Sequence, residues 1–279
     1  MEAHSLSWRR FLWAPLLVTI LLLVPPQAVF FWMSLHRQTG TDGLTLDNYA
    51  RVLTDGFYLG SLWTTVWLSL VATLLALLAG FPTAYILART RSAWISALIV
   101  LLLVSSFVTI VIKVLGLSLV LGRQGVVNEL LLALALIDQP LILLNNNIGV
   151  VIGLVQYTLP FLVMLLFSVI QTIPGSLEEA AELHGATRLS MFRRVVLPLA
   201  MPGLIAGSLI VFNLNMGAFT SAVLLGGGRV LTLPVVIQRK ILLDVDYPIA
   251  ATLATLLVGV VFLINVASAL LVRRRAAGA

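Results

Sequence analysis

Six long runs of apolar side chains constrain the fold of this chain more than any other feature. They cover residues 11–35, 62–88, 94–119, 148–173, 201–225 and 247–272. A helix needs roughly 20 apolar residues to cross the hydrocarbon core of a bilayer. With 60% hydrophobic and only 10% charged residues, the chain cannot cover a water-facing surface. We therefore predict an all-α membrane protein with six transmembrane helices, organised as a single transmembrane domain over residues 1–279.

The basic residues predict how the chain lies in the bilayer. With the N-terminus in the cytoplasm, ten of the 17 lysines and arginines fall in the inner segments, which are the shorter ones. They are Arg9, Arg10, Arg89, Arg91, Arg188, Arg193, Arg194, Arg273, Arg274 and Arg275. Cytoplasmic loops carry such an excess of arginine and lysine. Both termini are therefore expected in the cytoplasm, and the net charge of +6 reflects the membrane rather than nucleic acid.

The outer segments are longer and carry most of the acidic residues. Residues 47–53 and 126–136 have the pattern of short amphipathic helices lying at the outer interface. Either they form ordinary surface structure, or they offer a docking face to an extracytoplasmic partner. Composition alone does not separate the two interpretations.

Several kinds of chemistry are excluded by the residues that the spans lack. The chain has no cysteine, so disulfides, thiolate metal sites and cysteine nucleophiles are ruled out. Its histidines, His4, His36 and His184, lie outside the spans and belong to no zinc motif. No Asp or Glu lies inside a span, whereas ion-coupled carriers usually need an intramembrane carboxylate. We therefore expect no intramembrane enzyme and no cofactor or metal bound by this chain. The missing carboxylates favour a transporter powered from outside the membrane, with a stand-alone secondary transporter as the less favoured alternative.

The segment 174–198, between the fourth and fifth runs, has the clearest local signals. Ser176 and Glu179 have the spacing of a capping box, which predicts a helix start. Gly185 would end this helix in the left-handed conformation, and Thr187 would cap a second helix. Pro198 would mark the start of the fifth span. The segment is either an amphipathic connector or a surface that docks a partner.

The same segment resembles the signature of permease subunits of ABC importers. The matching residues are Glu179, Ala180, Ala181, Gly185, Val195, Leu197 and Pro198, with Val195 where the family usually has Ile. The resemblance implies a type I importer fold in which this loop is a coupling helix. Glu178, Glu179, Ala180, Ala181, Glu182, Gly185, Leu197 and Pro198 would then contact a partner ATPase. It also implies a second homologous permease, two copies of an ATP-binding subunit that hold ATP and magnesium, and an extracytoplasmic solute-binding protein.

Other segments resemble one branch of these permeases, the first of the two paired subunits for spermidine and putrescine. They include residues 47–49, 81–85, 121–128, 143–166 and 224–228. The stretch 105–113 departs from the branch, because it keeps a basic residue, Lys113, without most of the usual aromatic neighbours. The resemblance therefore implies a bacterial inner-membrane importer of polyamines. The alternative is another small solute, such as an amino-acid-like amine, an opine or a phosphonate.

A few polar residues inside the spans are candidates for the substrate pathway. They are Lys113, Gln156, Tyr157, Asn213 and Asn215, with Met216 beside them. Unpaired amides in hydrocarbon are costly, so these side chains must face a cavity or another helix. Asn213 and Asn215 share no face of a regular helix, and unwinding near Gly217 would change that. Lys113 would lie about 28 Å along a continuous third span from Trp94, where it either snorkels to the outer interface or contacts a gate.

Overall fold

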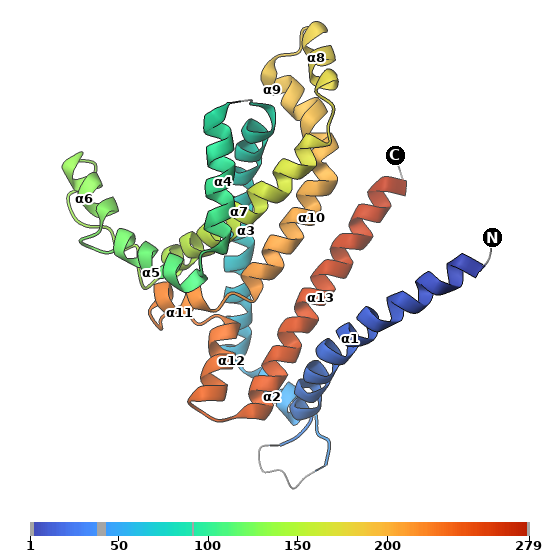
Figure 1. Cartoon of the computed structure of the whole chain (residues 1–279). Coiled ribbons are helices and arrows are strands. Elements are labelled where there is room, and N and C mark those ends of the chain that lie inside the picture. The colour runs from blue at the N-terminus through green and yellow to red at the C-terminus, as the bar shows by residue number, and fades with distance from the viewer. Residues whose placement is uncertain (1–2, 38–42, 91, 278–279) are drawn as a thin grey trace. The chain divides into compact units, whose positions relative to one another are not determined.

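Helices form all the regular structure in residues 3–37, 43–90 and 92–277, which are the residues that the computed structural model describes (Figure 1). They are α1 (Ala3–Ser34), α2 (Asp47–Thr54), α3 (Gly56–Arg89), α4 (Ala93–Phe107), α5 (Ile110–Leu121), α6 (Val126–Ala133), α7 (Asn147–Gln171), α8 (Gly175–Leu183), α9 (Arg188–Met191), the π-helical turn η1 (Phe192–Val196), α10 (Leu197–Met216), α11 (Thr220–Gly226), α12 (Leu233–Leu242) and α13 (Tyr247–Ala277). The chain divides into two compact units. Unit 1 comprises Met1–Leu62 and Val236–Ala279, and unit 2 comprises Trp63–Val235.

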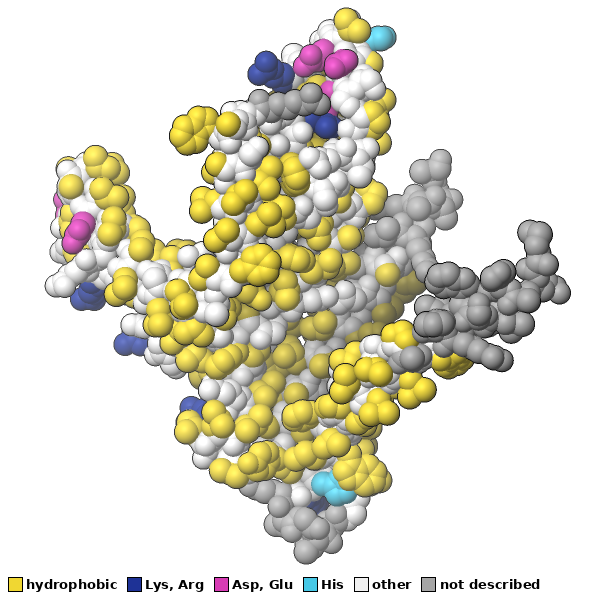
Figure 2. Space-filling view, viewed as in Figure 1, with side chains coloured by type: hydrophobic (Ala, Val, Ile, Leu, Met, Phe, Trp, Pro, Cys, Tyr) yellow, Lys and Arg dark blue, Asp and Glu magenta, His cyan; other side chains and the backbone are white. Residues whose placement is uncertain are grey.

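Six helical stretches of the described chain are long and apolar enough to cross a membrane, which confirms the predicted number. They are Pro15–Ser34, Gly56–Arg89, Ile110–Ala133, Asn147–Gln171, Arg188–Met216 and Tyr247–Leu270. Figure 2 shows hydrophobic side chains spread over the flank of unit 2 rather than confined to its interior. Trp63, Leu78 and Leu101 are examples, each more than 60% exposed. Such a surface is stable only against lipid or against another apolar protein surface.

The prediction of one continuous helix for the third span, 94–119, is wrong. Instead of one helix, α4 ends at Phe107, Val108 and Thr109 are extended, and α5 begins at Ile110. In Figure 1, α5 turns away from the axis of α4. The break falls where β-branched residues begin to dominate, and these lose side-chain freedom in a helix. The apolar stretch Ile110–Ala133 is itself interrupted at residues 122–125, which separate α5 from α6.

The fifth predicted span, 201–225, is wrong at both ends. The helix is continuous from α9 through η1 into α10, so it begins well before Met201. It ends at Met216, and α11 starts only at Thr220. The predicted unwinding near Gly217 is therefore present, but Asn213 and Asn215 both lie in the regular helix before it and face different directions.

Unit 2 is organised around α7, which packs against α4, α10 and α11. Its Leu162, Leu166 and Ile170 are fully buried. Glycines let α10 approach closely: a Cβ on Gly203 would lie 2.5 Å from a Val169 methyl carbon, and one on Gly207 would lie 3.1 Å from Leu162. Small residues four apart are a common contact surface between helices in membranes, because they let backbones approach.

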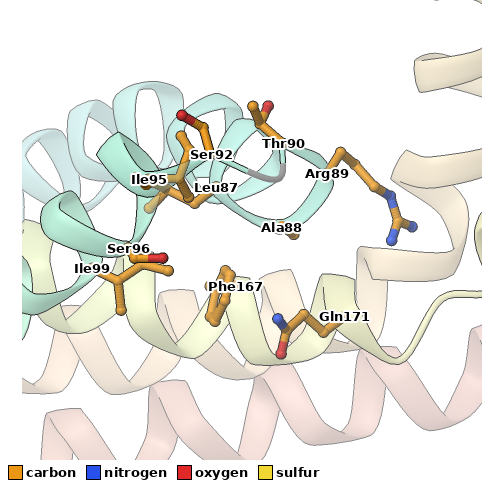
Figure 3. Close-up of a pocket in the computed structure, with 11 residues that line it drawn as sticks. Leu87, Ala88, Arg89, Thr90, Ser92, Ile95, Ser96, Ile99, Phe167 and Gln171 are labelled. Atoms are coloured by element: carbon orange, nitrogen blue, oxygen red, sulfur yellow. The ribbon is translucent and has the colours of Figure 1, made fainter.

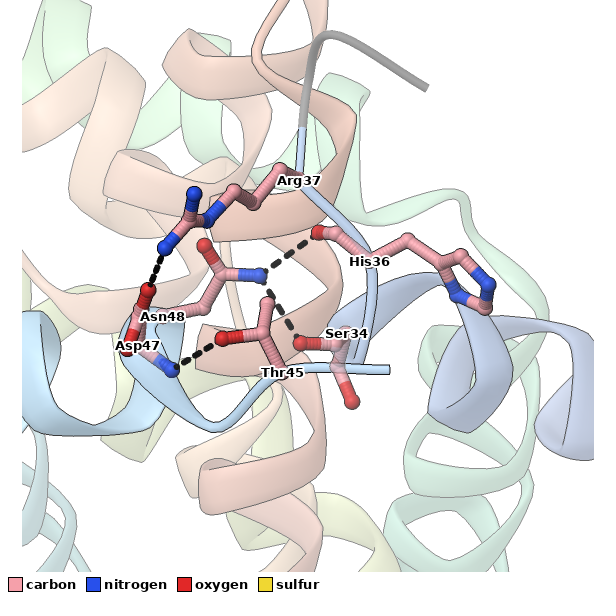
Figure 4. Close-up of polar contacts among 6 residues, drawn as sticks. All are labelled: Ser34, His36, Arg37, Thr45, Asp47 and Asn48. Atoms are coloured by element: carbon pink, nitrogen blue, oxygen red, sulfur yellow. Dashed lines mark hydrogen bonds and ion pairs between the residues drawn. The ribbon is translucent and has the colours of Figure 1, made fainter. Parts of the chain in front are cut away.

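Unit 1 is held together where α1, α2 and α13 meet (Figure 4). Asn48, on α2, donates hydrogen bonds to the carbonyls of Ser34 (2.9 Å), the last residue of α1, and His36 (2.8 Å), just beyond it. The hydroxyl of Thr252, on α13, lies between two carbonyl acceptors, Pro248 of its own helix at 2.8 Å and the same Ser34 carbonyl at 3.3 Å. Arg37 forms an ion pair with Asp47. The start of α1 and the end of α13 lie at the same end of this helix pair (Figure 1).

Both short outer helices predicted from the sequence are present, as α2 and α6. The second stops at Ala133 rather than at Leu136, because Ala135 adopts a positive φ of 52°. Arg91 lies outside the described residues. So do the side chains of Arg9, Arg10, Arg273, Arg274 and Arg275, which belong to the predicted inner set.

Candidate functional site

The loop 174–198 forms the helix–glycine–helix arrangement predicted from its sequence, but the predicted capping box is wrong. Helix α8 begins at Gly175 with Pro174 as its N-cap, so Ser176 already lies in the first turn. No side-chain hydrogen bond caps this end. Proline fixes φ and directs the chain into the helix one residue earlier than the Ser176–Glu179 spacing suggests.

Gly185 ends α8 as predicted, in the left-handed conformation with φ of +78°. The Gly185 amide donates to the Glu182 carbonyl at 2.9 Å, and the Ala186 amide donates to the Ala181 carbonyl at 3.0 Å. This pair of bonds is a Schellman motif, which satisfies the last carbonyls of a helix. Thr187 then caps α9, accepting a hydrogen bond from the Ser190 amide at 3.3 Å, also as predicted.

The helix after Gly185 runs without a break into α10 through the π-helical turn η1. The amide of Leu197 bonds to the carbonyl of Phe192, five residues earlier. Pro198 follows at once and has no amide hydrogen, so it cannot continue the ordinary pattern. The wider turn accommodates the proline within a helix that runs from the loop into α10.

Glu178 is the side chain that fixes α8 to the rest of unit 2. It is only 8% exposed, and its two carboxylate oxygens have different partners. Arg89, the last residue of α3, donates from Nε to Oε1 at 2.7 Å, and Tyr85 donates from its hydroxyl to Oε2 at 2.7 Å. Arg89 also donates from Nη2 to the Ile173 carbonyl at 2.9 Å. The network thus joins α3, the connection after α7, and α8.

A ring contact extends this network to the second half of the loop. Phe192 of η1 packs against Phe81 and Tyr85 of α3, with ring centroids 5.1 Å and 5.3 Å apart. Because residues four apart lie on one side of a helix, Phe81, Tyr85 and Arg89 form a single stripe along the end of α3. We call these three residues the α3 stripe. Both halves of the loop therefore rest on it.

Most other side chains of α8 are exposed, and most of them are apolar or acidic. Leu183 is 88% exposed and Leu177 is 44% exposed, and Glu179, Ala180 and Glu182 are also exposed. Figure 2 shows acidic side chains gathered at this end of unit 2. Leu177 and Leu183 are thus the large apolar side chains that α8 leaves exposed.

The remaining predicted coupling residues are placed around this helix. Ala181 is half-buried and, with Gly185, lines a shallow pocket between α8 and α9. Leu197 is half-buried at the start of α10, and Pro198 is exposed beside it. Both lie in the first turn of α10 and not in α8, so they connect the loop to the span.

A second cleft lies beside the α3 stripe, between the turn joining α3 to α4 and helix α7 (Figure 3). Its lining includes Ser92, Ser96, Phe167 and Gln171. Figure 3 shows Arg89 at the rim, with its guanidinium directed away from the other lining residues. The charge of Arg89 is therefore committed to Glu178 and not to this cleft.

Two of the predicted pathway residues have buried atoms without partners. Asn215 is only 2% exposed; its Nδ2 donates to Thr73 of α3 at 3.2 Å, while its Oδ1 has no partner among the described residues. Gln156, on α7, is half-buried, and its Oε1 likewise has no partner there. Ser221 and Thr232 also have buried hydroxyl oxygens without partners in that part of the chain.

The other pathway candidates show no common site. Met216 is fully buried, and Tyr157, Asn213 and Lys113 are half-buried. Lys113 lies on α5, beyond the break at Val108, so its predicted position along a continuous third span is wrong.

Sequence reasoning missed the α3 stripe, Phe192 and Thr73. The positive-inside pattern identifies Arg89 only as a basic residue of an inner segment, and its partner Glu178 lies 89 positions away. The four-residue spacing of Phe81, Tyr85 and Arg89 at the end of a span was the available signal. No cluster of three or more His, Asp or Glu side chains able to hold a metal occurs in the described part of the chain.

Known proteins are similar to this chain over most of its length. The model of the family described as binding-protein-dependent transport system inner membrane component matches residues 5–277. The spermidine/putrescine transport system permease protein PotB of Escherichia coli (strain K12) is 38% identical over 223 residues, which cover 79% of this chain and 81% of that protein. PotB of Haemophilus influenzae is 34% identical over 76% of this chain and 73% of its own length. A putative 2-aminoethylphosphonate transport system permease protein, PhnU of Salmonella typhimurium, is 26% identical over 91% of this chain and 89% of its own length.

Solved structures share the fold at low sequence identity. A bacterial alginate ABC transporter in complex with an alginate pentasaccharide-bound periplasmic protein contains a chain that superposes with a TM-score of 0.77 and 22% identity, covering 98% of this chain and 97% of that one. A chain of the MetNI methionine ABC transporter, in an inward-facing conformation, superposes with a TM-score of 0.57 and 21% identity, covering 77% and 94%.

Proposed function

The chain belongs to the family of binding-protein-dependent transport system inner membrane components, and from this premise we propose how it is powered and what it carries. It is a multi-pass permease subunit of an ABC importer. In the proposed assembly it pairs with a second homologous permease and forms half of the translocation pathway. Two copies of an ATP-binding subunit hold ATP and magnesium, and an extracytoplasmic solute-binding protein delivers the solute. This chain performs no catalysis of its own.

The observation that carries the proposal is the outward side of α8. Leu183 is 88% exposed at the tip of a loop that is otherwise well ordered by a Schellman motif and a threonine cap. A helix of nine residues is marginal alone, so its exposed side needs a surface to cover it. We assign that surface to the ATPase subunit, with Leu183 inserted in a groove and Glu179 and Glu182 at its edge.

This assignment sets the orientation of the chain. The loop must lie in the cytoplasm, where ATP is available, and the even number of spans then puts both termini there. The common direction of the start of α1 and the end of α13 supports the same arrangement. The arginines Arg188, Arg193 and Arg194 would lie at the cytoplasmic membrane face, which agrees with the positive-inside rule.

For the solute, we propose a polyamine such as spermidine or putrescine. The relatives named for polyamine transport are 34–38% identical to this chain. The buried Gln156 Oε1 and Asn215 Oδ1 are both hydrogen-bond acceptors without partners in the described residues. A protonated amine carries only donors, so such acceptors suit it, and no carboxylate is needed in the span.

The second candidate solute is an aminophosphonate. The PhnU relative covers more of this chain, 91% against 79%, although its identity is only 26%. A phosphonate would need donors along the pathway, and Lys113 is the charged donor in α5. The acceptors at Gln156 and Asn215 would then meet its amino group alone.

Reconstitution tests the powering of the permease. Liposomes that hold the two permeases, the ATPase and the loaded binding protein are expected to take up solute with ATP, whereas this chain alone gives no uptake. Glu179→Lys, or Gly185→Pro, is expected to abolish ATP-driven uptake while the protein still inserts in the membrane. Normal uptake by both variants would show that the loop does not couple to the ATPase.

A ligand screen on the cognate solute-binding protein tests the solute. A sharp rise in its thermal midpoint with putrescine or spermidine would support the polyamine assignment. No shift with either amine, together with a shift with 2-aminoethylphosphonate, would replace it with the second candidate.

A further inference from the structure

We propose that the α3 stripe, Phe81, Tyr85 and Arg89, receives the movement of the docked loop and passes it to the transmembrane helices. This inference rests on the proposed docking of α8, but it concerns the opposite side of that helix. Arg89 and Tyr85 act as positioning residues: they do not touch the ATPase, and they hold α8 so that it moves together with α3.

The polar contacts between α3 and α8 give a partner to each carboxylate oxygen of Glu178. Glu178 accepts from Arg89 and Tyr85 at 2.7 Å each, and the Arg89 guanidinium also reaches the Ile173 carbonyl at 2.9 Å. Ile173 lies immediately before the loop, so Arg89 binds both the start of the loop and its helix. Hydrogen bonds between ionised groups are shorter and stronger than neutral ones.

The second half of the loop is held by ring packing on the same stripe. Phe192 contacts Phe81 and Tyr85, and it belongs to η1, which continues into α10. Tyr85 therefore contacts both halves, Glu178 through its hydroxyl and Phe192 through its ring. Because both halves of the loop contact the same helix, we expect a displacement of α8 to displace α3 as well.

Burial makes this connection stiff. The Glu178 and Arg89 side chains are 11% and 23% exposed, so water does not readily replace either partner. Arg89 is also the last residue of α3, where a positive charge is favoured by the helix dipole. By contrast, α8 makes its other contacts with α9 and η1, inside the loop itself.

The test measures ATP hydrolysis and solute uptake separately in the complete transporter. Glu178→Gln and Arg89→Gln each remove one charge of the pair. We expect ATPase subunits to remain bound and ATP hydrolysis to continue, while solute uptake per ATP falls about tenfold, within the range of ordinary coupling free energies. Tyr85→Phe, which keeps the ring and loses the hydroxyl bond, is expected to show a smaller fall in the same ratio.

Two further variants keep the proposal falsifiable. The exchanged pair, Arg89→Glu with Glu178→Arg, restores opposite charges and should recover part of the uptake per ATP that either single exchange loses. Arg193→Gln removes a charge from an exposed position of the same loop and should leave the ratio unchanged. Unchanged uptake per ATP in both single glutamine variants would overturn the inference while leaving the docking proposal intact. Loss of ATPase binding in those variants would also overturn it, because the pair would then serve docking itself.

Discussion

Two polar regions of unit 2, one at the loop and one inside the spans, differ in how completely their hydrogen-bonding atoms are paired. At the loop, both carboxylate oxygens of Glu178 are bonded, and Arg89 has a further carbonyl partner. Inside the spans, the Asn215 and Gln156 oxygens are buried without a partner in the described chain. Buried polar groups in folded proteins are nearly always paired, so each exception needs a reason.

The difference indicates different tasks. A fully bonded network fixes one geometry, which suits an element that must transmit movement. Buried acceptors without partners cost stability in the empty protein, and that cost is recovered when a donor arrives. We therefore interpret the loop network as an element that transmits movement and the buried acceptors in the spans as part of the solute pathway.

The largest expected effect comes from breaking the bonded network. Arg89→Ala leaves Glu178 buried with Tyr85 as its remaining partner. Removing one member of a buried ion pair costs about 3 kcal/mol or more, since an uncompensated charge stays behind. This loss of stability is measured by thermal unfolding of the purified transporter, with ATPase binding and the helical signal as the two readouts. Arg193→Ala, at an exposed position, should change the midpoint little, and an equal drop in both variants would contradict the contrast.

The opposite result is expected for the acceptor in the membrane. Asn215→Leu removes a buried oxygen without a partner, so stability should be unchanged or should rise by up to about 1 kcal/mol. Uptake of a polyamine should nevertheless fall severalfold. The measurement pairs thermal unfolding with uptake kinetics, and Leu214→Val, at the exposed neighbouring position, is the control.

The alternative for Asn215 is a simple clamp between α10 and α3. In that case the hydrogen bond to Thr73, at 3.2 Å, would account for the residue entirely. Asn215→Leu and Thr73→Val would then lose stability together and leave uptake by the folded protein unchanged. That outcome would remove Asn215 from the proposed pathway.

The sequence predicts a region well when the interactions that form it join residues close together along the chain. Gly185 and Thr187 were predicted correctly because a left-handed stop and a threonine cap are encoded within a few residues. The capping box at Ser176 was wrong because Pro174 starts the helix earlier. The pairing of Glu178 with Arg89 could not be predicted from the sequence, because the two residues meet only when α3 packs against the loop.

The spans show the limit of apolar composition. It predicted six membrane stretches correctly, because length and hydropathy suffice for that. It could not locate the break at Val108 or the end at Met216, since a uniformly apolar run has no periodicity to mark a boundary. The unpaired state of Asn215 was equally hidden, because it depends on what α3 and α7 present to it.

A smaller effect is expected from backbone strain at the loop. Gly185→Ala forces a side chain into φ of +78°, although no atom would lie within 4 Å of its Cβ. The cost is about 1 kcal/mol from the left-handed backbone alone. Gly228, with φ of +74° and equally open surroundings, is a matched control, so Gly228→Ala should lose similar stability. Only Gly185→Ala should also lower uptake per ATP, and equal uptake in the two variants would argue against a special role for the loop.

The smallest effect is expected from an ion pair whose carboxylate is more exposed than that of Glu178. Lys240 and Asp244 form an ion pair at 2.8 Å. The hydrogen bond from Lys240 is the main cause that lowers the pKa of Asp244, and the same bond is the main cause that raises the pKa of Lys240. A lowered carboxyl pKa means that the pair stabilises the folded protein above the ordinary Asp pKa of 3.8 and loses this effect as the pH falls through the lower folded value. Asp244→Asn should therefore lower the thermal midpoint slightly at pH 7, and the difference from wild type should vanish below that folded pKa. Pairs open to water contribute little, and the Asp244 side chain is 37% exposed against 11% for Glu178. A loss at pH 7 as large as that of Arg89→Ala would therefore show that burial of the carboxylate is not what distinguishes the loop network.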